Sequence, residues 1–196
     1  MASTKRKAEG DVAGESSDAA KKQMTTAERA RDLNGWWALD LTTSDTLEKH
    51  LAALGMSEIP ILAAVKAEKE VTTLQRFDIT PTQVVIRKRM RLGTIDQKHE
   101  FGTPVVAGLK TTTATYDAGE LVVTTSMPRV KGGGNVELLD SRRIDAASDA
   151  LRMHQHMVLS ILSTGEKVET HRYYLPSDSP EELERLAALA DEAAAE

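Results

Sequence analysis

A series of short strand-like segments, separated by turns, constrains the fold of this chain more than any other feature. Regular short spacing of this kind is typical of an antiparallel all-β meander, and an earlier segment at 35–41 brings the total to nine. The breaks between segments hold turn residues, such as Asp117-Ala118-Gly119 and Gly132-Gly133-Gly134. A closed sheet of this size has an interior wide enough for side chains and one small ligand. The other segments are 71–79, 83–92, 95–101, 110–116, 120–126, 135–144, 151–162 and 167–175.

Two helices are predicted between the first strand-like segment and the others. Ser44 can cap a helix whose apolar positions are Leu47, Leu51 and Leu54, and this helix would end at Gly55. A second short helix is expected over 59–66. Placed there in the chain, the pair can cover one mouth of a barrel.

The two ends of the chain differ in composition from the middle. Residues 1–30 have almost no large apolar side chains, so we expect a disordered tail, whose basic clusters at 5–7 and 21–22 are spaced like a nuclear-import signal. Residues 177–196 predict a short amphipathic helix that begins at Ser179-Pro180. The barrel domain is therefore expected over 31–176.

Composition and charge exclude several classes of protein. A net charge of −5 and a pI near 5.6 argue against a general nucleic-acid binder, which normally carries a basic excess. The absence of cysteine excludes disulfides and thiolate chemistry. No segment approaches the roughly 18 apolar residues of a membrane helix, and no secretory signal is evident. We therefore expect a cytoplasmic protein, with the nucleus as a second location.

The last strand-like segment carries the clearest candidate site. Arg172 and Tyr174 are two residues apart, so their side chains point to the same face of a strand. On an inner face, the guanidinium would need an anion or strong acceptors beside it, and a ligand carboxylate is a natural partner. The alternative is a solvated outer face, where arginine is common.

Several motifs resemble those of the cytosolic fatty-acid-binding proteins and their retinoid-binding relatives, and they follow one another along the chain in the same order. Residues 34–39 are similar to the Gly-x-Trp-x-Leu opening of that family, and 44–55 to its first portal helix. Residues 110–122 resemble its central hairpin, and 163–165 its last turn. The resemblance covers 34–175 and implies an up-and-down barrel of about ten strands, partly closed and capped by a helix-turn-helix.

The resemblance also implies a function and site residues. It implies a monomeric, non-enzymatic carrier or buffer that holds a long-chain fatty acid or similar hydrophobic carboxylate in its cavity. Arg172 and Tyr174 match the Arg-x-Tyr of the family and are the expected carboxylate contacts. Leu47 falls where the family has an aromatic residue on the first portal helix, and it is the expected contact of the acyl chain.

The resemblance further implies a second inward arginine, for which two candidates remain. Arg142, followed by Ile144 and a turn, fits the Arg-x-Leu pattern best, while Arg152 lies closer to the expected spacing along the chain. Asp140 would share a face with Arg142 and could neutralise it without a ligand.

A histidine pair on one strand offers an alternative chemistry. His154 and His156 have a spacing compatible with metal binding, and a metal-dependent enzyme could use them. The other histidines lie on separate predicted elements, and no carboxylate follows at a matching spacing. We therefore expect no metal, no catalytic residue and no cofactor.

A basic stripe suggests a third class of function. Arg87, Arg89 and Arg91 alternate along one strand, so they can meet anionic lipid transiently or another acidic partner. An exposed strand face balanced by acidic neighbours is the competing interpretation. With the basic tail, the stripe also fits a barrel reused as a protein-interaction module, with a nuclear location.

Overall fold

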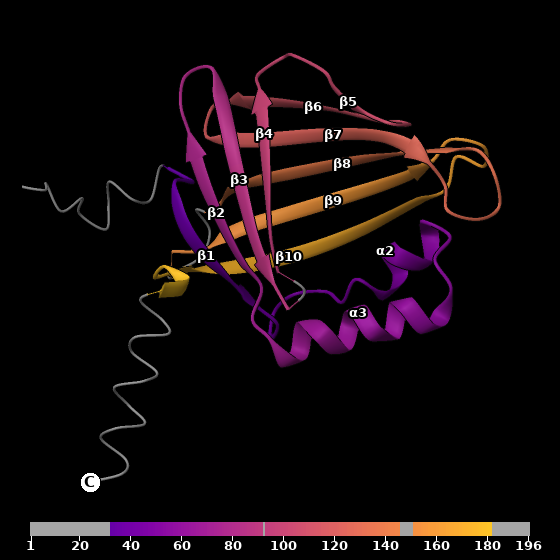
Figure 1. The fold of residues 1–196 in the computed structure, drawn as a ribbon, viewed down its shortest axis with the longest axis horizontal. Coiled ribbons are helices and arrows are strands. Elements are labelled where there is room, and N and C mark those ends of the chain that lie inside the picture. The colour runs from indigo at the N-terminus through magenta and orange to yellow at the C-terminus, as the bar shows by residue number, and fades with distance from the viewer. Residues whose placement is uncertain (1–31, 92, 146–150, 182–196) are drawn as a thin grey trace, which may run out of the picture.

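The computed structural model describes residues 32–91, 93–145 and 151–181 (Figure 1). Within these residues the chain forms one ten-stranded antiparallel sheet and two helices. The predicted N-terminal tail, 1–30, lies outside the described residues, which begin at Asp32. The C-terminal helix also lies outside them, except for helical Pro180 and Glu181.

The sheet is an up-and-down meander in which nearly every strand pairs with its neighbours in sequence. Its order is β4-β3-β2-β1-β10-β9-β8-β7-β6-β5. The first strand, β1, therefore pairs with both β2 and the last strand, β10. The strands are β1 (Gly35–Asp40), β2 (Leu74–Ile79), β3 (Gln83–Met90), β4 (Gly93–Glu100), β5 (Val105–Ala107), β6 (Lys110–Asp117), β7 (Glu120–Pro128), β8 (Asn135–Ile144), β9 (Met153–Ile161) and β10 (Lys167–Ser177).

The sheet folds over on itself without closing completely. Figure 1 shows β2, β3 and β4 crossing in front of β6 to β9. The edge strands β4 and β5 are not paired with each other, but the chain just after β4 reaches β6, where Gly102 donates its N–H to the carbonyl oxygen of Ala114 at 2.9 Å. The predicted fold class, a partly closed antiparallel barrel with two helices after its first strand, is confirmed.

The helices lie below β10 in Figure 1, and α2 contacts β10 and β9. They are α2 (Glu48–Ala53) and α3 (Glu58–Glu70). The prediction of Ser44 as a helix cap is wrong, because its hydroxyl instead accepts a hydrogen bond from the Tyr173 N–H at 2.8 Å and so ties the connection to β10. Neither of these helices, the ones described in the structure, is long and apolar enough to cross a membrane.

Among the boundaries that differ from the sequence prediction, two adjoin each other at the end of α3 and the start of β2. Helix α3 continues four residues beyond the expected end at 66, and β2 consequently begins at Leu74 rather than at 71. The segment 67–70 contains no glycine or proline to stop the helix, which ends only where Val71 becomes extended. Strand β5 was not predicted, because three exposed residues are too few to show a strand period.

The packing of the interior leaves a polar band between two apolar clusters. One cluster contains Trp37, Phe77 and Met153, and the other contains Val136 and Leu159, with Leu138 packed against it. On the inner face of β8, Asp140 and Arg142 fall between Leu138 of one cluster and Ile144, which packs on the other. The fold therefore places charged groups in the middle of the barrel.

Candidate ligand-binding site inside the barrel

Arg142 and Asp140 form a buried ion pair on the inner face of β8. Arg142 is 1 % exposed, and its Nη2 donates to Asp140 Oδ2 at 2.6 Å. Gln155, on the neighbouring strand β9, donates from Nε2 to the other carboxylate oxygen at 2.8 Å. The Phe77 ring lies under the guanidinium, with its centroid 5.5 Å from Cζ, which is a cation–π distance. The expected neutralisation of Arg142 by Asp140 is therefore present.

Asp140 uses only part of the hydrogen-bonding capacity of Arg142. The Nε and Nη1 atoms of Arg142 are buried and have no hydrogen-bond partner. A guanidinium carries five N–H donors, and leaving them unpaired in an interior is costly. This arginine can therefore accept a further anion beside its internal one.

The structure also decides between the two candidates for the second inward arginine. Arg152 lies on the outer side of β9, where its Nε donates to Asp145 at 2.6 Å and its Cζ lies 4.5 Å from the centroid of the Tyr173 ring. Arg142 is the inward one.

Arg172 lies on the inner face of β10, as predicted, and its charge partner comes from a helix. The residue is 4 % exposed, and its Nη2 lies 2.8 Å from Glu68 Oε1 on α3. This contact is an ion pair without hydrogen-bond alignment, because neither Nε nor Nη2 of Arg172 makes a hydrogen bond. A carboxylate from α3 thus contacts the guanidinium, which still carries N–H groups that make no hydrogen bond.

Tyr174 shares the inner face of β10, which confirms the predicted orientation. It is 1 % exposed, and burial raises the pKa of its phenol, which is therefore neutral at physiological pH. Its O–H donates to Gln155 Oε1 at 2.8 Å, and its oxygen accepts from Gln75 Nε2. A ligand carboxylate could accept a hydrogen bond from the phenol only by displacing Gln155.

Lys88 is an interior cation that the sequence analysis did not single out as a site residue. It lies on the inner face of β3, on the same side as buried Val84 and Ile86. Burial, and then the charge of Arg142, lowers the pKa of Lys88 to about 8. The signal was the alternation itself, because Lys88 follows two apolar residues at the strand period of two.

Two histidines also lie inside without full partners. Nδ1 of His50, on α2, and both ring nitrogens of His99, on β4, are buried and make no hydrogen bond. Burial lowers the pKa of both histidines, so both rings are neutral at physiological pH. They add polar atoms to the interior without adding charge.

An apolar pocket of about 170 Å³ lies where the helices meet β2 and β3. Leu47 lines it, together with Ala64, Ala67 and Val71 from the α3 region and Met90 at the end of β3. Glu68, the partner of Arg172, is also part of its wall. The predicted contact Leu47 is therefore at the helix end of the barrel, in a pocket whose wall includes the charge partner of Arg172.

Comparison with known proteins supports the fold. The REP1-NXSQ fatty acid transporter superposes with a TM-score of 0.54 at 18 % identity over 75 % of this chain and 97 % of its own. Lipid binding protein 8 of Caenorhabditis elegans gives 0.56 at 11 % identity over 79 % and 99 %. A Schistosoma mansoni fatty acid binding protein in complex with arachidonic acid gives 0.54 at 14 % identity over 74 % and 96 %.

The fold is that of the fatty-acid-binding proteins. No family model matches the sequence, and no curated protein matches it either. With identities this low, the likeness concerns the arrangement of the strands and helices, and the site has to be argued from its own residues.

The other sequence signals lie on the outside of the barrel. Arg87 donates from Nε and Nη2 to both carboxylate oxygens of Asp96 at 2.8 and 3.0 Å, and Arg91 pairs with Glu70. Acidic neighbours thus balance at least two members of the basic stripe. His154 and His156 project from the outer face of β9, opposite to buried Gln155.

Proposed function

We propose that this protein binds a fatty acid or a similar hydrophobic carboxylate inside the barrel and carries or buffers it, without catalysing a reaction. The observation that carries the proposal is the presence of two buried arginines whose guanidinium groups retain nitrogens that make no hydrogen bond, Nε and Nη1 of Arg142 and Nε and Nη2 of Arg172, although Nη2 of Arg172 is in ion-pair contact with Glu68. Buried charged donors of this kind stabilise an anion strongly, because the low-dielectric surroundings strengthen each contact.

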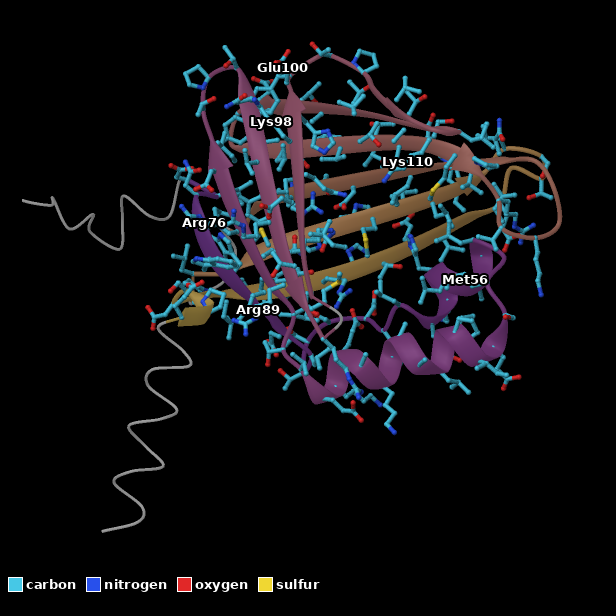
Figure 2. The ribbon with its side chains drawn as sticks, in the orientation of Figure 1. Met56, Arg76, Arg89, Lys98, Glu100 and Lys110 are labelled. Carbon is cyan, nitrogen blue, oxygen red and sulfur yellow. The ribbon has the colours of Figure 1, made fainter. Side chains whose placement is uncertain are left out.

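The balance of interior charge supports a singly charged ligand. Arg142, Arg172 and Lys88 bring three positive charges, whereas Asp140 and Glu68 bring two negative ones. Lys110, which Figure 2 shows on β6, is half-buried and adds to the positive potential at Lys88. One carboxylate would therefore balance the charges of the three cations and two carboxylates counted first, and Lys110 would add to its attraction.

The apolar part of a ligand would supply most of the binding energy. Burial of a methylene group stabilises by about 0.8 kcal/mol, before the cost of ordering the chain is subtracted. A hydrogen bond to a charged group adds about 1.5–3 kcal/mol. The apolar clusters on either side of the polar band provide surfaces for the chain, while the arginines fix its head.

The contact between Glu68 and Arg172 suggests how the helices take part. Glu68 belongs to α3, lines the apolar pocket, and stands where a ligand carboxylate would approach Arg172. A ligand that enters past Leu47 would compete with Glu68 for the guanidinium and loosen α3 from β10. Exchange of the ligand would then be gated by a local motion of the helices.

Displacement of a fluorescent fatty acid from the purified protein tests the proposal. Arg172→Met combined with Glu68→Gln removes the guanidinium without leaving its carboxylate partner unpaired, and it should weaken binding about ten- to hundredfold. Arg76→Met is the matched control, because Arg76 is an exposed arginine paired with Asp78 on the outside of β2 (Figure 2). Absence of saturable binding, or equal affinity in the double variant and the control, would contradict the proposal.

A further inference from the structure

The outer face of β9 and β10 gathers four side chains that can take part in metal binding. His171 on β10 pairs in register with His156 on β9, and Tyr173 pairs with His154. Glu169 lies two residues before His171 and therefore on the same face. From the sequence alone, His171 lies on a separate predicted strand and no metal is expected, since only the strand register brings these residues together.

The donor atoms of His156, Glu169 and His171 converge. Nε2 of His156 lies 3.1 Å from Glu169 Oε2, and Nε2 of His171 lies 4.0 Å from the same oxygen. One donor atom from each residue falls within 4.8 Å of the other two. Tetrahedral ligands bound to zinc at about 2.1 Å are about 3.4 Å apart, so the donor atoms would have to shift by about an ångström, and the two histidine rings would have to rotate, to complete the geometry.

A hydrogen bond with His154 can fix the tautomer of His171 that such a site needs. Nε2 of His154 lies 3.0 Å from Nδ1 of His171. If His171 donates its Nδ1–H to His154, its Nε2 is left as a lone-pair donor that faces Glu169. Metal-binding histidines typically donate their other ring N–H to a partner in this way, which fixes the tautomer and the ring.

The backbone and the neighbouring rings further restrict this cluster. The N–H of His171 donates to Asp45 Oδ2 at 2.8 Å, and the N–H of Asp45 donates to the His171 carbonyl oxygen at 2.8 Å. The rings of His156 and His171 stack, with centroids 4.4 Å apart and planes 4° apart. Because an imidazole binds a metal ion in the plane of its ring, both rings would have to turn out of this parallel stack on metal binding, while the backbone bonds at His171 can stay in place.

We propose that His156, Glu169 and His171 bind one divalent transition metal ion, with water completing the coordination and His154 as the positioning residue. Two imidazoles and a carboxylate suit Zn²⁺, and also Cu²⁺ and Ni²⁺, better than Ca²⁺ or Mg²⁺, which prefer oxygen ligands. The site lies on the outer face of the strands whose inner face carries Arg172 and Gln155, so it is separate from the proposed carboxylate site.

Calorimetric titration of the full chain, without a histidine tag, with ZnCl₂ tests the site. We expect saturable binding of one ion per chain, and at least a tenfold loss of affinity in His171→Gln and in Glu169→Gln. Glu137→Gln is the matched control, because Glu137 is an exposed carboxylate on the neighbouring strand β8, and this variant should bind as the parent does. Thermal unfolding without metal shows whether each variant is folded.

A second variant separates the positioning role of His154 from simple packing. His154→Phe keeps an aromatic ring in the stack but removes the partner of His171 Nδ1, and it should weaken Zn²⁺ binding about tenfold. The visible absorption of bound Co²⁺ should change in this variant, because the orientation of His171 changes. Absence of saturable Zn²⁺ binding, or binding that a folded His171→Gln chain retains in full, would overturn the proposal.

Discussion

Replacement of Asp140 by asparagine should increase the affinity of the protein for a fatty acid. Asp140 is the internal counterion of Arg142 and holds one edge of its guanidinium at 2.6 Å. Its charge also repels any carboxylate that binds the unpartnered Nε or Nη1. Asparagine keeps the size of the side chain and one acceptor oxygen, but it removes the negative charge.

The size of the effect follows from the geometry of the pair. A carboxylate at the unpartnered Nε or Nη1 of Arg142 would lie roughly 6 Å from the Asp140 charge, and at an effective dielectric constant of about 20 the two repel by about 3 kcal/mol. Relaxation and water reduce this to about 1–2 kcal/mol, a gain in affinity of about five- to thirtyfold. The unliganded variant should be less stable by about 3 kcal/mol, because Arg142 loses its buried counterion.

Fluorescence displacement and thermal unfolding together check this prediction. Asp140→Asn should bind an oleate probe more tightly than the parent, and saturating ligand should raise its midpoint of unfolding by more than that of the parent. Asp78→Asn, which changes an exposed carboxylate on β2, is the control and should change neither quantity. If folded Asp140→Asn binds the probe with equal or lower affinity, Arg142 is not a carboxylate contact.

Three further predictions concern pH, lid opening and stability. Because the pKa of Lys88 is about 8, affinity for a carboxylate should be constant between about pH 6 and 7 and fall as the pH rises through about 8. Lys88→Met should flatten this profile in a binding titration. The pKa of this lysine in the folded protein lies below its value in the unfolded chain, so the unfolded state holds more protons between about pH 8 and 10.5. The free energy of unfolding in urea should therefore contain a contribution from Lys88 that rises with pH in that window. This contribution should be absent in Lys88→Met. Glu68→Gln should speed ligand entry in stopped-flow binding, because α3 loses the ion pair that holds it on the barrel in the unliganded protein. An unchanged entry rate would show that this pair does not hold the lid. Gly55→Ala should destabilise the fold by about 2–4 kcal/mol in urea unfolding, because an added Cβ would lie 2.6 Å from a backbone nitrogen. Gly119 has a similar φ, +83° against +84° at Gly55, but a Cβ there would meet nothing within 4 Å, so Gly119→Ala should cost only the backbone strain of about 1 kcal/mol. Equal losses in the two variants would contradict the clash.

The alternation of strand residues allowed the inner face of β10 to be predicted. Because the period of a strand is two, Arg172 and Tyr174 had to share a face, and the same rule placed Asp140 with Arg142. These assignments depend on local geometry alone. Leu47 was placed by resemblance to the portal helix, and it does line the pocket at the helices.

The partners of these residues could not be predicted, because they come from distant segments. Glu68 meets Arg172 only through the docking of α3 on the barrel, and the prediction ended that helix at 66, before Glu68. The histidine cluster likewise depends on the register between β9 and β10, which sequence spacing does not reveal. Lys88 could have been recognised, since it continues the apolar face of Val84 and Ile86.

The most direct test of carboxylate binding inside the barrel is nuclear magnetic resonance of a fatty acid labelled at its carboxyl carbon. With the protein in excess, the account predicts a single bound carboxyl signal that stays ionised well below the pH at which a free carboxyl titrates, because buried arginines favour the charged form. The signal should be lost or should titrate normally in Arg172→Met combined with Glu68→Gln. A carboxyl signal that titrates as it does in water in the parent protein, or no bound signal, would contradict the account.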